Sequence, residues 1–82
     1  MEKETEPGAL ICTIMACPGY SRPPRDGVQR YKYYVGICPE GSLGILVDIS
    51  REPATSKRAK FIQVLVNGRA FWIKGIYARV MT

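Results

Sequence analysis

The chain has 82 residues, with 12 lysines and arginines, seven acidic residues and no histidine. This length suits one domain, and we expect a flexible acidic lead-in over residues 1–8, followed by a single domain over residues 9–82. Without histidine, the commonest acid–base group at neutral pH is missing, and no phosphate-binding loop or nucleophile motif occurs. We therefore expect a protein that is not an enzyme and that holds no cofactor and no metal.

The first predicted strand covers residues 9–16, where apolar and β-branched side chains stand between two Pro-Gly pairs. This run is too short to cross a bilayer. The residues before it are acidic, whereas a secretory signal begins with basic residues. We therefore expect a cytoplasmic protein with no membrane partner.

Residues 17–27 contain three prolines and two glycines, which predicts a loop. Residues 28–37 then alternate aromatic or apolar residues with cations. This period of two predicts a half-buried strand. Tyr31 and Tyr33 are expected to face inward, which leaves Arg30, Lys32 and Tyr34 on the outer face.

A turn is predicted over residues 38–44 and a strand over residues 44–50, where Ile45, Val47 and Ile49 alternate with Leu46 and Asp48. Residues 51–60 are polar and basic, which predicts an exposed loop between two strands.

The strongest local signal is Asn67-Gly68 between two β-rich runs, at residues 61–66 and 69–73. Asn-Gly readily adopts the two positive φ angles of a type I′ turn, so we expect a hairpin. A single helical turn at residues 76–78 and a short last strand at residues 79–81 complete the predicted elements.

Five or six short strands separated by turn signals predict an all-β fold, either a small antiparallel barrel or a sandwich. Closure is favoured because an open sheet would leave apolar edges exposed. The order of elements, with GSLGILVDIS at residues 41–50 and QVLVNGRAFWI at residues 63–73, resembles the SH3-like barrel family, in particular short bacterial and phage proteins. The resemblance covers about residues 9–80. It implies a five- to six-stranded antiparallel SH3-like barrel with one short helical turn before the last strand.

A rival resemblance is to the Sm-like barrel, because WIKG at residues 72–75 is similar to the second motif of that family. Ile49 and Ser50 stand where that family has the Met-Asn pair that reads RNA bases. Sm-like proteins also open with a helix, which the proline-flanked lead-in does not suggest. No RNA-reading residues are therefore carried over.

Six cations and no acidic residue follow Glu52. This asymmetry predicts an acidic partner, either nucleic acid or an acidic protein surface, although a solvated basic face accounts for the same charge. Cations interleaved with tyrosines at residues 30–34 suit base stacking and phosphate contact, and the basic loop at residues 56–60 suits phosphate contact. The candidate binding residues are Arg30, Lys32, Tyr34, Lys57, Arg58, Lys60, Lys74 and Arg79.

A second hypothesis is an accessory protein of a phage or bacterium that acts in assembly, with self-association through an edge strand or an apolar patch. Strand phase places Phe71 and Ile73 on one face and Trp72 on the other, and we expect Trp72 to fill the interior, as large aromatics do in small barrels. The three cysteines suit small core residues in a reducing compartment. A single bridge, Cys12–Cys38 or Cys17–Cys38, is the alternative.

Overall fold

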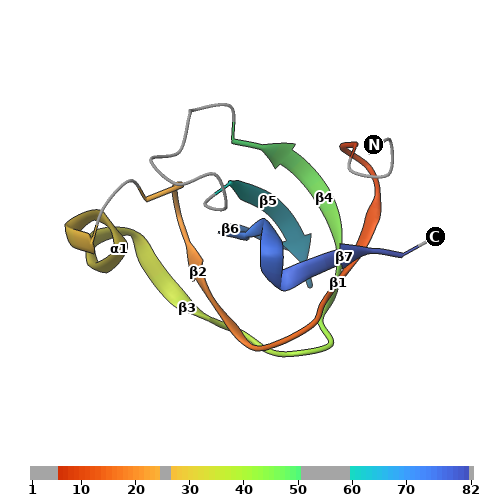
Figure 1. Ribbon diagram of the computed structural model, residues 1–82, viewed down its shortest axis with the longest axis horizontal. Coiled ribbons are helices and arrows are strands. Elements are labelled where there is room, and N and C mark those ends of the chain that lie inside the picture. Colours follow the sequence, from red (N-terminus) through yellow and green to blue (C-terminus); the bar gives the residue numbers. More distant parts are fainter. Residues whose placement is uncertain (1–5, 25–26, 51–59, 82) are drawn as a thin grey trace.

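The computed structural model describes residues 6–24, 27–50 and 60–81. They form one antiparallel sheet of seven strands, together with one short helix and a 3-10 turn, so the all-β class is confirmed and the predicted strand number is wrong. Figure 1 shows strands that curve around the molecule, with β5 and β6 in the middle of the view. In chain order, the elements are β1 (Leu10–Thr13), β2 (Cys17–Tyr20), α1 (Gly27–Tyr33), β3 (Tyr34–Cys38), β4 (Leu43–Ile49), β5 (Phe61–Val66), β6 (Arg69–Lys74), η2 (Gly75–Tyr77) and β7 (Ala78–Val80).

The order of strands in the sheet is β3-β2-β6-β5-β4-β1-β7. Strand β1 pairs with β4 and β7, and β2 pairs with β3 and β6. The strand predicted over residues 9–16 forms only as the shorter β1, and the next strand, β2, pairs in a different part of the sheet. The expected flexible lead-in is held at its end, since the Gly8 amide donates to the Leu46 carbonyl at 2.7 Å.

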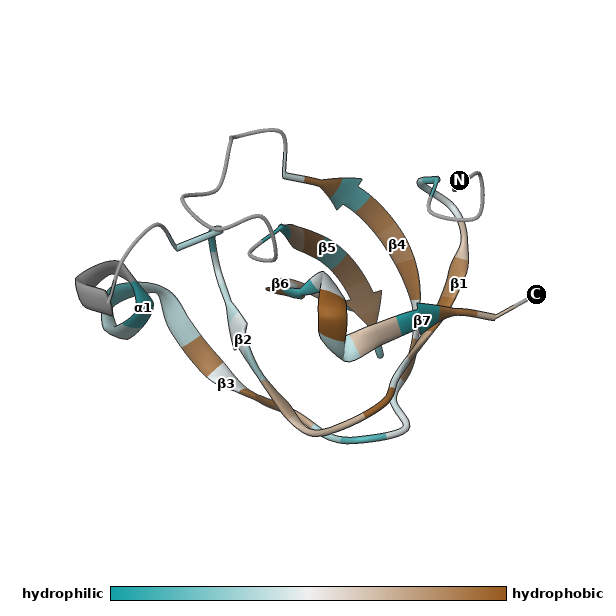
Figure 2. Ribbon diagram, in the orientation of Figure 1, coloured by the Kyte–Doolittle hydropathy of each residue, from teal (hydrophilic) through white to brown (hydrophobic). Residues whose placement is uncertain are grey.

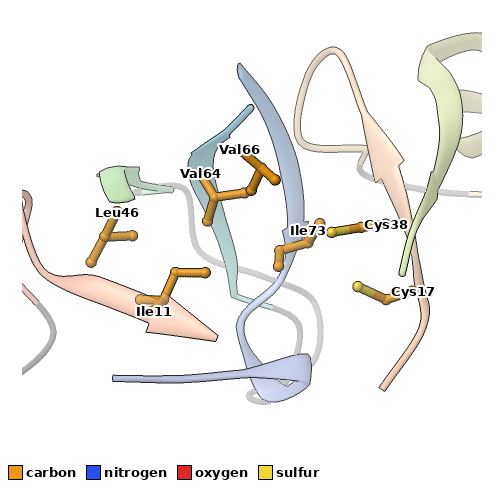
Figure 3. Packing of buried hydrophobic residues seen from close by; sticks show 7 residues of the cluster. All are labelled: Ile11, Cys17, Cys38, Leu46, Val64, Val66 and Ile73. Atoms are coloured by element: carbon orange, nitrogen blue, oxygen red, sulfur yellow. The ribbon is translucent and has the colours of Figure 1, made fainter. Parts of the chain in front are cut away.

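One apolar cluster fills the concave side of this sheet (Figure 3). Hydrophobic residues also dominate β4 and β5 in Figure 2. Alternate side chains of each strand point to the same face, so one or two positions from each of six strands, β1 to β6, supply the buried cluster. The buried members are Ile11, Cys17, Cys38, Leu46, Val64, Val66 and Ile73.

Thr13 is the only buried polar side chain among the described residues. Its hydroxyl donates to the Pro39 carbonyl at 2.7 Å and accepts from the Ser42 amide at 2.8 Å. These two hydrogen bonds satisfy the hydroxyl, as burial requires, and they fasten β1 to the turn between β3 and β4.

The hairpin predicted at Asn67-Gly68 is confirmed. Val66 lies opposite Arg69, and φ is 52° at Asn67 and 78° at Gly68, the two positive values that a type I′ turn needs. The helical turn and the last strand are also confirmed, each beginning one residue earlier than predicted.

Strand β4 forms where predicted, but its buried side chains do not follow a simple alternation along the strand. Leu46 lies in the core, whereas Ile45 and Val47 are exposed. A register shift lies between Leu46 and Asp48. The extra residue of such a bulge changes the phase of the strand, and Ile49 returns to pack against the core.

Two predictions for residues 17–37 are wrong. Residues 17–20 of the expected loop form β2, and proline is tolerated there because β6 reaches β2 only at Tyr20, opposite Trp72. The first part of the expected strand over residues 28–37 is helix α1. Gln29, Arg30 and Lys32 are good helix formers, and Arg30 and Lys32 lie in the last turn of helix α1, where the helix dipole favours cations.

Trp72 does not fill the interior, which corrects the expectation for this residue. Ile73 is fully buried and Phe71 packs against the core, as the strand phase places them together. Trp72 therefore points to the other face of β6, where it is half-buried.

Candidate functional site

A cavity of about 450 Å³ lies where helix α1 meets strands β2 and β3. Three tyrosines and one arginine line it: Tyr20 from β2, Arg30 and Tyr31 from α1, and Tyr34 from the start of β3. Figure 1 shows α1 at the far end of the two strands, away from β7. Among the described residues, none of the lining side chains is a carboxylate. We call these four residues the tyrosine pocket.

Tyr20 forms the fixed base of the tyrosine pocket. Its side chain is only 6% exposed. Its ring meets the ring of Phe61 edge to face, with centroids 5.9 Å apart, and meets that of Tyr34 at 6.4 Å. Edge-to-face contacts at these distances are favourable, so Tyr20 holds Tyr34 in a defined orientation.

The other two tyrosines of the pocket present their rings to solvent. Tyr31 is 89% exposed and Tyr34 is 48% exposed. Folding gains little from a ring as exposed as that of Tyr31, because the apolar area removed from water is small. The two rings are therefore open for stacking with a planar ligand.

Two cations of α1 accompany these rings. Arg30 is exposed and lines the tyrosine pocket, where a guanidinium can bind phosphate through paired hydrogen bonds. Lys32 is the other cation of the helix, with its Nζ atom 5.9 Å from the centroid of the Tyr33 ring, and it is not part of the pocket lining. Rings for stacking and one cation for phosphate thus line the same pocket, with Arg30 and Tyr31 on a helix and not on the outer face of a strand.

The other predicted site residues do not join this group. Lys57 and Arg58 lie outside the described residues. Lys60 and Arg79 line a second cavity of about 330 Å³, which is otherwise mostly apolar. Lys74 ends β6, opposite Phe61. The predicted set is therefore split: Arg30 and Tyr34 line the tyrosine pocket, Lys32 lies over the Tyr33 ring outside that lining, and the described cations after Glu52 do not share the site.

Sequence reasoning missed two members of the pocket. Tyr20 was placed in a loop and Tyr31 was expected to face inward. A four-residue strand with proline at its second position carries almost no strand signal. The helix was hidden because aromatic residues at every second position suit a strand equally well over so few residues.

Comparison with known protein families, with curated proteins and with solved structures found no match. Within the described part of the chain, no three histidine, cysteine or acidic side chains come close enough to hold a metal ion. A search of the same residues found no helix with the length and apolar character needed to span a membrane.

Proposed function

We propose that this protein is a non-enzymatic binding module that takes single-stranded nucleic acid at the tyrosine pocket. The observation that carries the proposal is the exposed Tyr31 ring, which lines one cavity together with Arg30 and Tyr34. Stacking of one base on an aromatic side chain contributes about 1–3 kcal/mol and tolerates any sequence. Arg30 and Lys32 supply the positive charge for the phosphates beside the stacked base.

A single strand suits the pocket better than a duplex does. Base faces are available for stacking only when the bases are unpaired, whereas a duplex presents its phosphates and groove edges. No described element longer than the seven-residue helix α1 is available to enter a major groove. The exposed rings of Tyr31 and Tyr34 therefore favour unpaired nucleotides.

We also propose that the sheet belongs to the SH3-like barrel type. The pairing of Tyr20 in β2 with Trp72 in β6 supports this, because it connects the first part of the chain to the far side of the hairpin β5–β6. The helical turn η2 before the short strand β7 is a second feature of that type.

The test of the nucleic-acid proposal is fluorescence polarisation of labelled oligothymidine, random single-stranded RNA and duplex DNA at two salt concentrations. Replacing Tyr31 by alanine is expected to weaken binding of single strands roughly 5- to 150-fold. Ile76→Ala, an exposed apolar residue of η2, is the matched control and should leave binding unchanged. Equal affinity of the Tyr31→Ala variant and the parent would refute the tyrosine pocket as the binding site.

Arg30→Ala addresses the phosphate contact. Each phosphate neutralised on a single strand contributes about 0.7 to the slope of log affinity against log salt. Loss of Arg30 is expected to reduce that slope by about this amount, whereas Lys74→Ala, with the same change in charge but outside the pocket, should not. An equal reduction in both variants would mean that only net charge matters.

A second candidate function is self-association through the outer face of the sheet. Leu10, Ile45 and Leu65 are exposed, and they lie directly opposite one another on β1, β4 and β5. Leu43 and Val47 extend this row along β4 and are also exposed. A contiguous aliphatic area is unusual on a monomer and suits packing against the same face of a second copy.

Light scattering across a salt titration separates the two candidate functions. Association through the aliphatic face is expected to persist at high salt, whereas nucleic-acid binding weakens. Ile45→Lys should abolish association, and Ile37→Lys on the exposed β3 provides the control. A monomeric parent protein at all salt concentrations would exclude the second candidate.

A further inference from the structure

Two buried thiols face each other across the β2–β3 ribbon, by which we mean strands β2 and β3. Cys17 and Cys38 are direct register partners, and their side chains are 1% and 3% exposed. Both are free cysteines that belong to the apolar core. Figure 3 shows the two side chains as neighbours at the end of the core cluster, beside Ile73.

The position of these residues suits a covalent bond. Directly opposite residues of an antiparallel pair have Cα atoms about 4.5 or 5.5 Å apart, and both values lie within the roughly 4.4–6.8 Å range of disulfide-bonded cysteines. Cys12 lacks such a partner, because its register partners are Leu43 and Arg79. Of the two bridges that the sequence allowed, the register therefore favours Cys17–Cys38.

We propose that Cys17 and Cys38 are a thiol–disulfide site, bridged by exchange with a small-molecule disulfide such as oxidised glutathione, and that the bridge holds the ribbon that carries the tyrosine pocket. The effect on ligand binding rests on the proposed function, whereas the bridge itself does not. Tyr20 and Tyr34 pair with each other at the other end of the same ribbon.

The exchange takes place in two balanced steps. A thiolate of the pair attacks one sulfur of the small disulfide, whose S–S bond breaks and releases one thiol. The second thiolate then attacks the protein sulfur of this mixed disulfide, which forms the Cys17–Cys38 bond and releases the second thiol. The protein loses two hydrogens, and the oxidant is reduced to two thiols.

Burial makes the pair slow to react at neutral pH. Burial, and to a smaller extent the neighbouring Cys38, raises the pKa of the Cys17 thiol from 9.0 to about 11. The thiolate is the nucleophile, so exchange needs alkaline conditions or transient opening of the ribbon. Once formed, the bridge is shielded from reductants by the same burial.

The bridge has a structural reason to affect the tyrosine pocket. Between the two ends of the ribbon, the register shifts between Gly19 and Tyr20, and Gly36 has a φ of 137°. The bulge bends the ribbon, and glycine at position 36 allows a backbone angle that residues with a side chain rarely adopt. A bond across Cys17 and Cys38 limits how far the strands can separate below that bend, which organises Tyr20 and Tyr34 before a ligand arrives.

The experiment treats the full chain with oxidised glutathione at pH 8.5 and maps the products by mass spectrometry. The expected product has lost two hydrogens, links Cys17 to Cys38, and melts at a temperature higher by roughly 8 °C or more than the reduced protein. The matched control Cys12→Ser should form the same link. Neither Cys17→Ala nor Cys38→Ala should form an intramolecular bond.

Three outcomes would overturn the proposal: a link that includes Cys12, glutathione adducts without a link, or a bridged protein that melts below the reduced one. The Cys12→Ser protein keeps both core thiols, so its mapping decides the question even if the alanine variants fold poorly. Polarisation with oligothymidine is then compared for bridged and reduced protein, with slower dissociation expected after bridging. A bridged protein of raised melting temperature that binds no oligonucleotide would refute the proposed function and leave the disulfide site intact.

Discussion

The sheet body, by which we mean β1, β4, β5 and β6, and the β2–β3 ribbon with helix α1 use their apolar residues differently. In the sheet body, alternate side chains such as Ile11, Leu46 and Val64 lie in the core. In the ribbon, Cys17 and Cys38 reach the core, but Val35 and Ile37 of β3 are exposed. The sheet body therefore supplies most of the buried cluster, to which the ribbon adds only its two cysteines. Both regions also carry exposed apolar side chains, such as Ile45 in the sheet body and Ile37 in the ribbon.

Buried side chains of the core and exposed side chains of the tyrosine pocket therefore have different roles, the first in stability and the second in the proposed function. A ring as exposed as Tyr31 contributes little to folding, so its place beside Arg30 points to a ligand. A fully buried side chain such as Ile73 contributes to folding and does not line the tyrosine pocket. Substitutions in the two regions should accordingly change different measurable quantities.

The largest expected effect is on the stability of the sheet body. Ile73→Ala removes a fully buried side chain from the centre of the core, and such truncations lower the free energy of unfolding by about 2–5 kcal/mol. Tyr31→Ala in α1 should change it by less than about 0.5 kcal/mol, as surface substitutions do. Urea denaturation of both variants measures the difference, and similar losses would contradict the division into two regions.

The elements of the sheet body could be predicted from the sequence because their signals are local. Asn67-Gly68 determines a turn by its own φ preferences, and the runs on either side alternate with a period of two. The bulge after Leu46 could not be predicted, since it depends on how β4 meets β5. Nor could the place of Trp72, because alternation gives two faces without saying which one is inside.

The candidate site was predicted only in part, because the sequence does not show that residues 27–33 form a helix. Arg30, Lys32 and Tyr34 were selected on composition, and composition does not depend on whether the segment is a strand or a helix. Tyr20 and Tyr31 were missed because their roles depend on α1 and the end of β2 lining one cavity, which is a tertiary arrangement. Seven residues are too few for helical periodicity to show.

The second expected effect is that the free energy of unfolding depends on pH through Cys17, which lies where the ribbon joins the core. Burial raises the pKa of Cys17 from 9.0 to about 11, so between these values the thiol ionises in the unfolded chain but not in the folded one. The stability from the neutral buried thiol is present in full below pH 9 and is lost as pH rises to 11, with a total on the order of 2 kcal/mol.

Urea denaturation of reduced protein at pH 8 and pH 10.5 tests this dependence, with Cys17→Ala as the reference that lacks the thiol. The two proteins differ only at this position, so the difference between them reports on Cys17 and its coupling to Cys38. The parent should lose more stability than the variant over this range. A constant difference would show that the thiol does not couple folding to pH.

The last comparison concerns two glycines with positive φ angles, one in each region. Gly68 of the hairpin has a φ of 78° and Gly36 of the ribbon has a φ of 137°, and a Cβ atom at either would meet nothing within 4 Å. Alanine should therefore cost only backbone strain, roughly 1 kcal/mol at Gly68, close to the left-handed helical region, and roughly 1–3 kcal/mol at Gly36, whose φ lies outside it. Thermal unfolding should show a loss in both variants, whereas oligothymidine binding should weaken in Gly36→Ala alone, since Gly36 lies between Tyr34 and Cys38. Equal binding by both variants would mean that the bend of the ribbon does not position the tyrosine pocket.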